Sequence, residues 1–207
     1  MSKPPQQSSP DVVRRKLERA AQRGRYVRVH RWIPGAESLN GFVLGVGDTW
    51  TVLALCEDLA LNGYAILRTD DISRVRKRED VLTMRVLQER GEWPLASPLA
   101  EADLVDERSL LQACARLPGL VCVSMERKSK WVDACWIGVV LGLGHRSLRL
   151  HQVSPQARWH RRPSKFRLDA ITAVSFGGNY ERILEEFAGE RPAPEVQSTV
   201  QPVTARA

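Results

Sequence analysis

The sequence contains no long apolar run. A membrane-spanning helix needs about 20 consecutive apolar residues, and a secretory signal needs an apolar core behind its start. The opening segment, MSKPPQQSSPD, has no such core, and no later segment approaches the length of a membrane span. The sequence therefore predicts a cytoplasmic protein that makes no contact with a membrane.

Spacings typical of metal, phosphate and nucleophile chemistry are also missing. The cysteines form no Cys-x-x-Cys pair, and the histidines show neither His-x-x-x-His nor His-Glu-x-x-His spacing. The glycines of residues 41–47 and 138–144 lack the Lys-Ser/Thr pair of a phosphate-binding loop. We therefore expect no metal, no cofactor and no catalytic residue. The histidines are expected to lie exposed on strands and loops, and the protein is not expected to be an enzyme.

Positive charge is plentiful. The formal net charge is +7, and residues 1–31 hold many more Lys and Arg than Asp and Glu. A basic surface attracts polyanions such as nucleic acid. The alternative is a solvated helix face, because the sequence has no run of five or six like charges.

Segments rich in Pro, Gln and Ser divide the chain. Residues 1–10 and 190–207 lack apolar periodicity and predict disordered tails. Residues 93–104 contain Pro94 and Pro98 and predict a linker. The tails and the linker leave two units, which are residues 11–92 and 105–189.

The two units repeat one pattern. The heptapeptides at 41–47 and 138–144 differ only at their second and sixth positions and share all three glycines. Glycine inside a strand usually marks a bend or bulge. Residues 67–75 and 166–174 then share the pattern Asp-x-Ile-x-x-Val. Because the same features recur in the same order at a near-constant offset, the sequence predicts an internal duplication.

Each unit is expected to begin and end with a helix and to hold short strands between them. The predicted helices begin at or near Asp11, Asp80, Asp106 and Asn179, with Asp11, Asp106 and Asn179 as N-caps. Loops at Asn62–Gly63 and Pro155 are expected before the fourth strand of each unit. The predicted strands cover residues 26–32, 41–47, 50–57, 67–75, 120–126, 138–144, 145–153 and 166–174. This composition predicts a mainly β, α+β fold.

A helix followed by short bent strands resembles the Sm-like (LSm) barrel. Gly41 with Asp48 and Leu55 is similar to the first Sm motif, and residues 66–75 are similar to the second. The chain as a whole also resembles a type of bacterial protein. The resemblance implies two tandem small barrels of the Sm-like or SH3-like kind, each preceded and followed by a helix, over residues 26–78 and about 120–176.

The family binds a nucleic-acid base with an Asn of the first motif and an Arg of the second. Arg68 and Arg167 occupy the arginine position in the two units, whereas the Asn position falls at Thr51 or Val52 in the first. The resemblance therefore extends to the fold more completely than to base binding. The alternative for both arginines is a strand-end residue that pairs with a nearby carboxylate.

The loop at residues 158–167 is the best candidate for a binding segment. Its cations could contact phosphates, and its interleaved aromatics could stack on bases. Arginines beside aromatics are equally typical of a protein-binding surface. A further alternative is a long hairpin loop with Trp159 folded onto the barrel. Together with the second-motif arginine of the first unit, the predicted nucleic-acid-binding residues are Arg68, Arg158, Trp159, Arg161, Arg162, Lys165 and Arg167.

Two cysteines stand where the first unit has polar residues. Cys122 aligns with Arg28 and Cys135 with Ser38, on strands that would form a hairpin. A cross-strand disulfide is one interpretation, and its geometry would have to allow it. Unpaired, half-exposed thiols are the other, and a reducing cytoplasm favours them.

The sequence thus leads to two functional hypotheses. The first is a non-enzymatic binding or scaffold module that recruits an unknown protein partner, or another copy of itself, through edge strands. The second is binding of RNA or single-stranded nucleic acid through the basic loops and the basic N-terminal helix.

Overall fold

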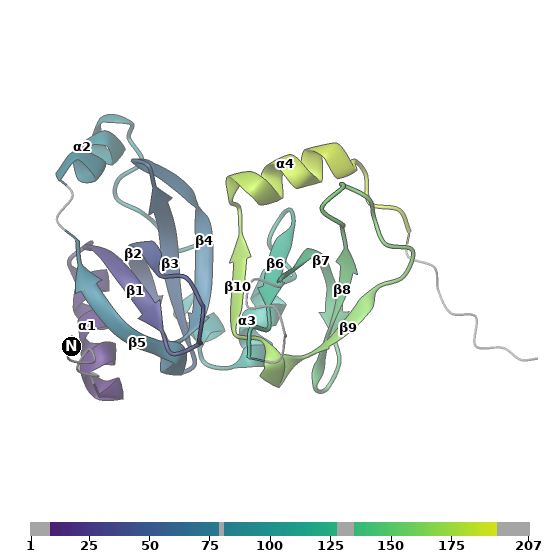
Figure 1. Cartoon of the computed structure of the whole chain (residues 1–207), viewed down its shortest axis with the longest axis horizontal. Coiled ribbons are helices and arrows are strands. Elements are labelled where there is room, and N and C mark those ends of the chain that lie inside the picture. Colours follow the sequence, from purple (N-terminus) through teal and green to yellow (C-terminus); the bar gives the residue numbers. More distant parts are fainter. Residues whose placement is uncertain (1–8, 79–80, 128–134, 194–207) are drawn as a thin grey trace, which may run out of the picture.

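The structure, a computed structural model, describes residues 9–78, 81–127 and 135–193. This part of the chain is mainly β, with one ten-stranded antiparallel sheet and four α-helices (Figure 1). The predicted α+β class is confirmed. The predicted tails fall mostly on residues 1–8 and 194–207, which lie outside the described residues. Within the described ranges, no helix has the length and apolarity to cross a membrane.

The sheet is divided between two halves of the chain. The first half comprises α1 (Pro10–Gln22), β1 (Tyr26–Arg31), β2 (Leu39–Val46), β3 (Trp50–Glu57), β4 (Ala60–Arg68), the 3₁₀ turn η1 (Thr69–Asp71), β5 (Ile72–Lys77) and α2 (Val81–Glu89). The second half comprises the 3₁₀ turn η2 (Glu101–Leu104), α3 (Glu107–Cys114), β6 (Val121–Ser124), β7 (Cys135–Leu143), β8 (Ser147–Gln152), β9 (Ser164–Arg167), the 3₁₀ turn η3 (Leu168–Ala170), β10 (Ala173–Phe176) and α4 (Asn179–Ala188).

The strand order is the same in both halves. Across the sheet it runs β5-β1-β2-β3-β4-β10-β6-β7-β8-β9, so the fifth strand of each half lies beside the first. Strands β4 and β10 join the halves, while β5 and β9 lie at the two free edges (Figure 1). The ten strands therefore form one open sheet, and two separate closed barrels are not seen.

The repeated heptapeptides adopt the same bulged strand. The pairing of β2 with β3 shifts between Val43 and Gly45, and that of β7 with β8 shifts between Val140 and Gly142. The repeated Asp-x-Ile-x-x-Val segments also match, because each forms a 3₁₀ turn that leads into the last strand of its half. The duplication predicted from the sequence is therefore visible in the backbone.

The hydrophobic core crosses the boundary between the halves. Trp50 and Ile66 of the first half lie in one buried cluster with Leu110 and Val174 of the second. Leu104, which belongs to the predicted linker, is 1% exposed and lies in the same cluster. A second cluster fills the first half, where α1 packs Val13, Leu17 and Ala20 against β1, β2, β3, β4 and β5. Burial of this apolar surface is the main force that holds the halves together.

Two of the predicted helix starts are wrong by one or two residues. Helix α1 begins at Pro10 with Ser9 as its N-cap, since proline suits the first helical turn. Helix α4 begins at Asn179 with Gly178 in the capping position. Asp106 caps α3 as predicted, because its carboxylate accepts hydrogen bonds from the backbone N–H groups of Arg108 and Ser109 at 2.7 and 2.8 Å.

The predicted loop at Asn62–Gly63 is also wrong, because both residues lie inside β4. The turn falls instead at Asp58 and Leu59, whose φ angles of 48° and 66° suit a tight hairpin. Gly63 has another reason to be glycine. A Cβ at this position would lie 2.4 Å from the backbone nitrogen of Gly178, where the chain leaves β10.

Candidate functional site

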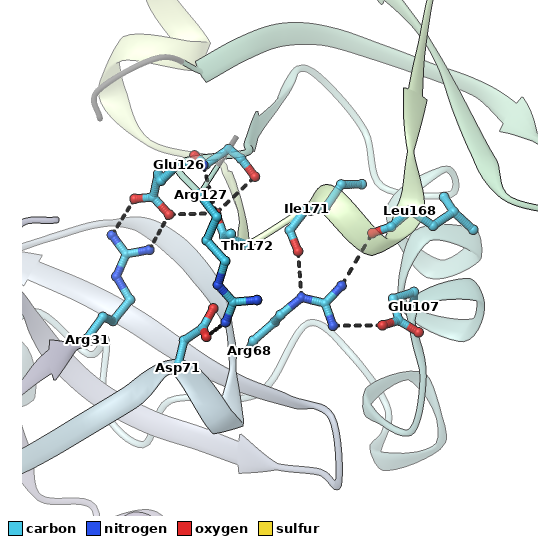
Figure 2. A network of polar contacts seen from close by, with 10 residues as sticks. Arg31, Arg68, Asp71, Glu107, Glu126, Arg127, Leu168, Ile171 and Thr172 are labelled. Carbon is cyan, nitrogen blue, oxygen red and sulfur yellow. Dashed lines mark hydrogen bonds and ion pairs between the residues drawn. The ribbon is translucent and has the colours of Figure 1, made fainter. Parts of the chain in front are cut away.

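The junction between the halves carries a network of polar contacts, and Arg68 lies within it (Figure 2). From the end of β4, Arg68 donates hydrogen bonds to the backbone oxygens of Ile171 at 2.6 Å and Leu168 at 3.3 Å. It also forms an ion pair of 2.7 Å with Glu107 at the start of α3. Its guanidinium carbon lies 4.6 Å from the ring centre of Trp50. Arg68 is therefore occupied in holding the second half against the first.

A buried ion pair forms a second contact across the junction. Two nitrogens of Arg31, at the end of β1, donate to the carboxylate of Glu126 at 2.7 and 2.6 Å (Figure 2). The two side chains are only 6% and 8% exposed. Thr172 donates a third hydrogen bond to the same carboxylate at 2.6 Å. Such a bidentate pair is geometrically specific, and loss of either partner would leave a buried charge.

Asp71 and Arg127 form a third contact between the halves (Figure 2). The Asp71 side chain is 2% exposed, whereas that of Arg127 is 51% exposed. The three ion pairs bring three arginines and three carboxylates together, so their charges cancel. This junction is therefore suited to holding the halves together, and its groups are not free to bind a ligand.

Arg167 is the equivalent of Arg68 in the second half, at the end of a strand, β9, that has no further strand beside it in the described part of the chain. The strand register places Arg167 opposite Ser147, as Arg68 lies opposite Trp50. Ser147 therefore places no aromatic ring opposite Arg167, which pairs with the nearby Asp169, at 2.9 Å from its Nε. A pocket of about 420 Å³ opens here, lined by Asp106, Glu107, Arg108, His145, Arg146, Arg167, Leu168 and Asp169. The pocket mixes both signs of charge and lies beside the free edge strand β9.

The two aromatic side chains of the predicted binding loop, Trp159 and Phe166, pack against the rest of the protein. The indole N–H of Trp159 donates to the backbone oxygens of Ala188 and Gly189 at 3.2 and 3.3 Å. Its ring lies 5.2 Å from that of His151, and it packs on the cluster under α4. Phe166 is 8% exposed. Trp159 thus folds onto the sheet and is half-buried, and Phe166 is buried, so most of the aromatic surface that the loop could offer to a base is covered.

The cations of the loop remain on the surface. Arg158, Arg161 and Arg162 are exposed in the loop, as are Lys165 and Arg167 on β9. The structure therefore brings the loop residues together along one edge of the sheet. It separates them from Arg68, which lies at the junction between β4 and β10.

The comparisons with known proteins identify no relative. No protein-family profile, no curated protein and no solved structure matches this chain. Any assignment of function must therefore be argued from the structure itself.

Groups that could bind a metal do not gather in the described ranges of the chain, where no three His, Cys, Asp or Glu side chains form a cluster. Two histidines differ from the expectation that all four are exposed. His30 is half-buried, with its Nε2 covered. His151 is 0% exposed, and its Nε2 lies 2.7 Å from the backbone oxygen of His160. The prediction that it is exposed is wrong, because β8 lies between two other strands and beneath Trp159.

Cys122 and Cys135 are unpaired thiols on the neighbouring strands β6 and β7, where they are diagonal neighbours, since Cys122 lies opposite Ile137 and Cys135 opposite Ser124. Cys122 donates a hydrogen bond to the sulfur of Cys135, which lowers the pKa of Cys135 to about 7. The same hydrogen bond, together with burial, raises the pKa of Cys122. Cys135 is exposed, so its thiolate is accessible to solvent.

We expect Cys135 to be the first cysteine that iodoacetamide modifies at pH 7. Replacing Cys122 with Ala removes the hydrogen bond, returns the pKa of Cys135 toward its ordinary value and slows the alkylation at pH 7 by roughly tenfold. Mass spectrometry of the timed reaction measures this rate. Cys114 is the internal control, because burial raises its pKa to about 12. Equal rates of Cys135 alkylation in the unaltered chain and in C122A would contradict the hydrogen bond between the two thiols.

Sequence reasoning missed the partners of the junction residues. Arg31 and Glu126 are far apart in the chain, and no local pattern marks them as a pair. One signal for Arg68 was available. The arginine of the second motif occurs in both units, as Arg68 and Arg167. Glu107 follows the first unit, so only Arg68 has this carboxylate across the junction among the described residues.

Proposed function

We propose that this chain is a non-enzymatic binding module, made of two Sm-like units over residues 11–92 and 105–189 that are joined through residues 93–104. Its free β9 edge binds an extended segment of a partner protein, in a cytoplasmic setting that suits its reduced thiols. The observation that carries this proposal is the pairing of β4 with β10. The edge of β4 is covered by β10, a strand of the other half. Strand β9 is the equivalent of β4 in the second half, and its edge is uncovered in the described residues.

The pairing of β4 with β10 indicates what kind of strand would pair with β9. Strand β4 pairs with β10 in antiparallel register from Leu67 opposite Ala173 to Tyr64 opposite Phe176. The paired side chains are uncharged and largely apolar. Strand β9 offers a similar length of backbone but carries Lys165 and Arg167. A partner strand for β9 is therefore extended and acidic, because opposite charges across neighbouring strands stabilise pairing.

Another copy of the same chain is a poor partner. Among the described strands the other free edge is β5, which carries Arg74, Arg76 and Lys77. Joining β5 to β9 would place like charges across neighbouring strands, which is destabilising. Charged edge strands are a common means of preventing this kind of polymerisation. We therefore expect the chain to be monomeric on its own.

Charge reversal on β9 tests whether this edge can accept a strand. The variant K165E/R161E carries acidic groups beside β9, and we expect it to pair with the basic β5 of another copy. We expect this variant to form oligomers whose size rises with protein concentration, and the unaltered chain to remain a monomer. Gel filtration with light scattering measures the mass of both. Adding R74E/R76E to the same chain restores repulsion and the monomer. A K165E/R161E variant that stays monomeric at high concentration would count against the proposal.

A second candidate function is binding of RNA or single-stranded nucleic acid through the loop at residues 158–167 and the basic helix α1. The exposure of Arg158, Arg161 and Lys165 favours it. Because Trp159 and Phe166 are packed away, this binding would rest on phosphate contacts and would weaken steeply with salt. Affinity for mixed RNA and DNA oligonucleotides at two salt concentrations tests it, and absence of binding at low salt removes it.

A further inference from the structure

A compact group of three arginines and one histidine lies on β1 and β5, away from the loop and from β9. The register of the two strands places Arg28 opposite Arg76 and His30 opposite Arg74. All four side chains lie on the face of the first half that is opposite α1, since the intervening Val27, Val29 and Val75 point into the α1 core. Like charges directly opposite one another destabilise a sheet, so this arrangement needs an explanation beyond folding.

The second half of the chain shows that the fold does not require these cations. The strand register places Ser175 opposite Cys122 and Ala173 opposite Ser124, at the positions that Arg76, Arg28, Arg74 and His30 occupy in the first half. The same backbone is thus built with small uncharged side chains. The three arginines and His30 are therefore specific to the first half and are not a requirement of its architecture.

Protection of the free edge explains only part of the group. Charges on an edge strand discourage unwanted pairing, and this accounts for Arg74 and Arg76 on β5. It does not account for Arg28 and His30, because β1 lies inside the sheet between β5 and β2.

The described part of the chain supplies little neutralising charge to this face. Arg28 donates to the Asn40 side chain at 2.8 Å, and no described carboxylate pairs with Arg74 or Arg76. The Nε2 of His30 is buried without a hydrogen-bond partner. Burial and the three neighbouring arginines lower the pKa of His30. The face therefore concentrates positive potential.

We propose that Arg28, His30, Arg74 and Arg76 form a binding face for the sugar–phosphate backbone of single-stranded nucleic acid. Guanidinium groups match phosphate oxygens through paired N–H donors, and three of the four residues are arginines. The cations occupy two neighbouring strands at alternate residues, so they span about 7 Å along the strands and about 5 Å across them. This area contacts a few successive phosphates of one strand.

The chemistry of the face favours a phosphate backbone over base recognition. The neighbouring side chains on the same face are Tyr26 of β1 and Asn40 and Phe42 of β2. Both aromatics are buried in a cluster with Leu87 of α2. Tyr26 and Phe42 are thus covered, and the exposed Trp32 lines a pocket with Asp11 and Arg14 of α1, on the other side of the strands. Arg78 is not included, because it lines an adjoining pocket of about 520 Å³ together with Glu57 and Asp58. Binding is therefore independent of base sequence and sensitive to salt.

The experiment uses the full chain and fluorescent oligonucleotides of RNA and of single-stranded DNA, with a duplex for comparison. With about three phosphates neutralised, the logarithm of the affinity falls with the logarithm of salt concentration with a slope near −2. The variant R74A/R76S carries the residues of the second half at these positions. We expect it to bind roughly tenfold more weakly at low salt, with a slope smaller by about 1.4.

The matched control is R90S/R182S, which removes the same charge from two exposed positions outside every proposed binding surface, one directly after α2 and one on α4. We expect it to bind within about twofold of the unaltered chain at the same salt. Thermal unfolding confirms that R74A/R76S is folded, and shifts of the His30 ring resonances on adding oligonucleotide place the contact at the face. Equal losses in both variants, tighter binding of the duplex, or equally tight binding of poly-glutamate would each overturn the proposal. Oligomers of K165E/R161E test the β9 edge separately, so the two proposals can fail independently.

Discussion

Replacing Glu126 with Ala is expected to lower the free energy of unfolding by about 3–5 kcal/mol. The change removes the carboxylate that accepts two hydrogen bonds from Arg31 and one from Thr172. Arg31 is 6% exposed, and its Nε already has no hydrogen-bond partner among the described residues. Its charge would therefore remain buried and uncompensated. Urea denaturation followed by circular dichroism measures the change.

Two controls separate this buried charge from a general loss of an ion pair. E89A breaks the exposed pair of Arg85 with Glu89, whose side chains are 70% and 63% exposed, and is expected to cost less than about 0.5 kcal/mol. The double variant R31M/E126L removes both buried charges and is expected to recover most of the stability. If E126A and E89A were equally stable, the buried pair would not be holding the two halves together.

Replacing Gly138 with Ala is expected to cost about 3 kcal/mol or more. A Cβ at this position would lie 2.1 Å from the backbone oxygen of His151 on the neighbouring strand β8. Both groups belong to the sheet backbone, so neither can move aside without breaking the pairing of β7 with β8. The midpoint of chemical denaturation reports the loss.

The duplication provides an independent repeat of this experiment. Gly41 is the equivalent residue of the first half, and its Cβ would lie 2.1 Å from the backbone oxygen of Ala54. We expect G41A to be destabilised to a similar extent. G91A is the matched control, because no atom lies within 4 Å of its Cβ and only its φ of 70° opposes the change. Its expected cost is about 1 kcal/mol. A G138A variant no less stable than G91A would contradict the close approach of the strands.

Much of the fold could be predicted from local patterns. Apolar residues at helical spacing predicted α1 and α3, and strand alternation predicted β1 and β6. These patterns succeed because each element buries one face, and burial sets the spacing of apolar residues. The prediction of a loop at Asn62–Gly63 was wrong because a long-range contact decides the residue at this position. Its glycine is required by the close approach of the chain after β10, which is distant in the sequence.

The candidate site was predictable only in part. The cations of the loop at residues 158–167 lie on the surface as a charged loop should, but its aromatics do not. Local sequence could not show that Trp159 reaches the end of α4. The cationic face on β1 and β5 was missed because its members come from segments far apart in the chain, and only strand pairing places Arg28 beside Arg76.

The sequence by itself determined that the chain is duplicated and mainly β, because repeated glycines and apolar spacing act locally and identically in both halves. The tertiary structure alone decided what the two copies do differently. Strand pairing joins β4 to β10 and leaves β5 and β9 at the free edges. Equivalent residues therefore meet different neighbours, so Arg68 holds the junction whereas Arg167 lies beside an open pocket. Long-range contacts of this kind depend on how the sheet is assembled, and no local pattern of residues encodes them.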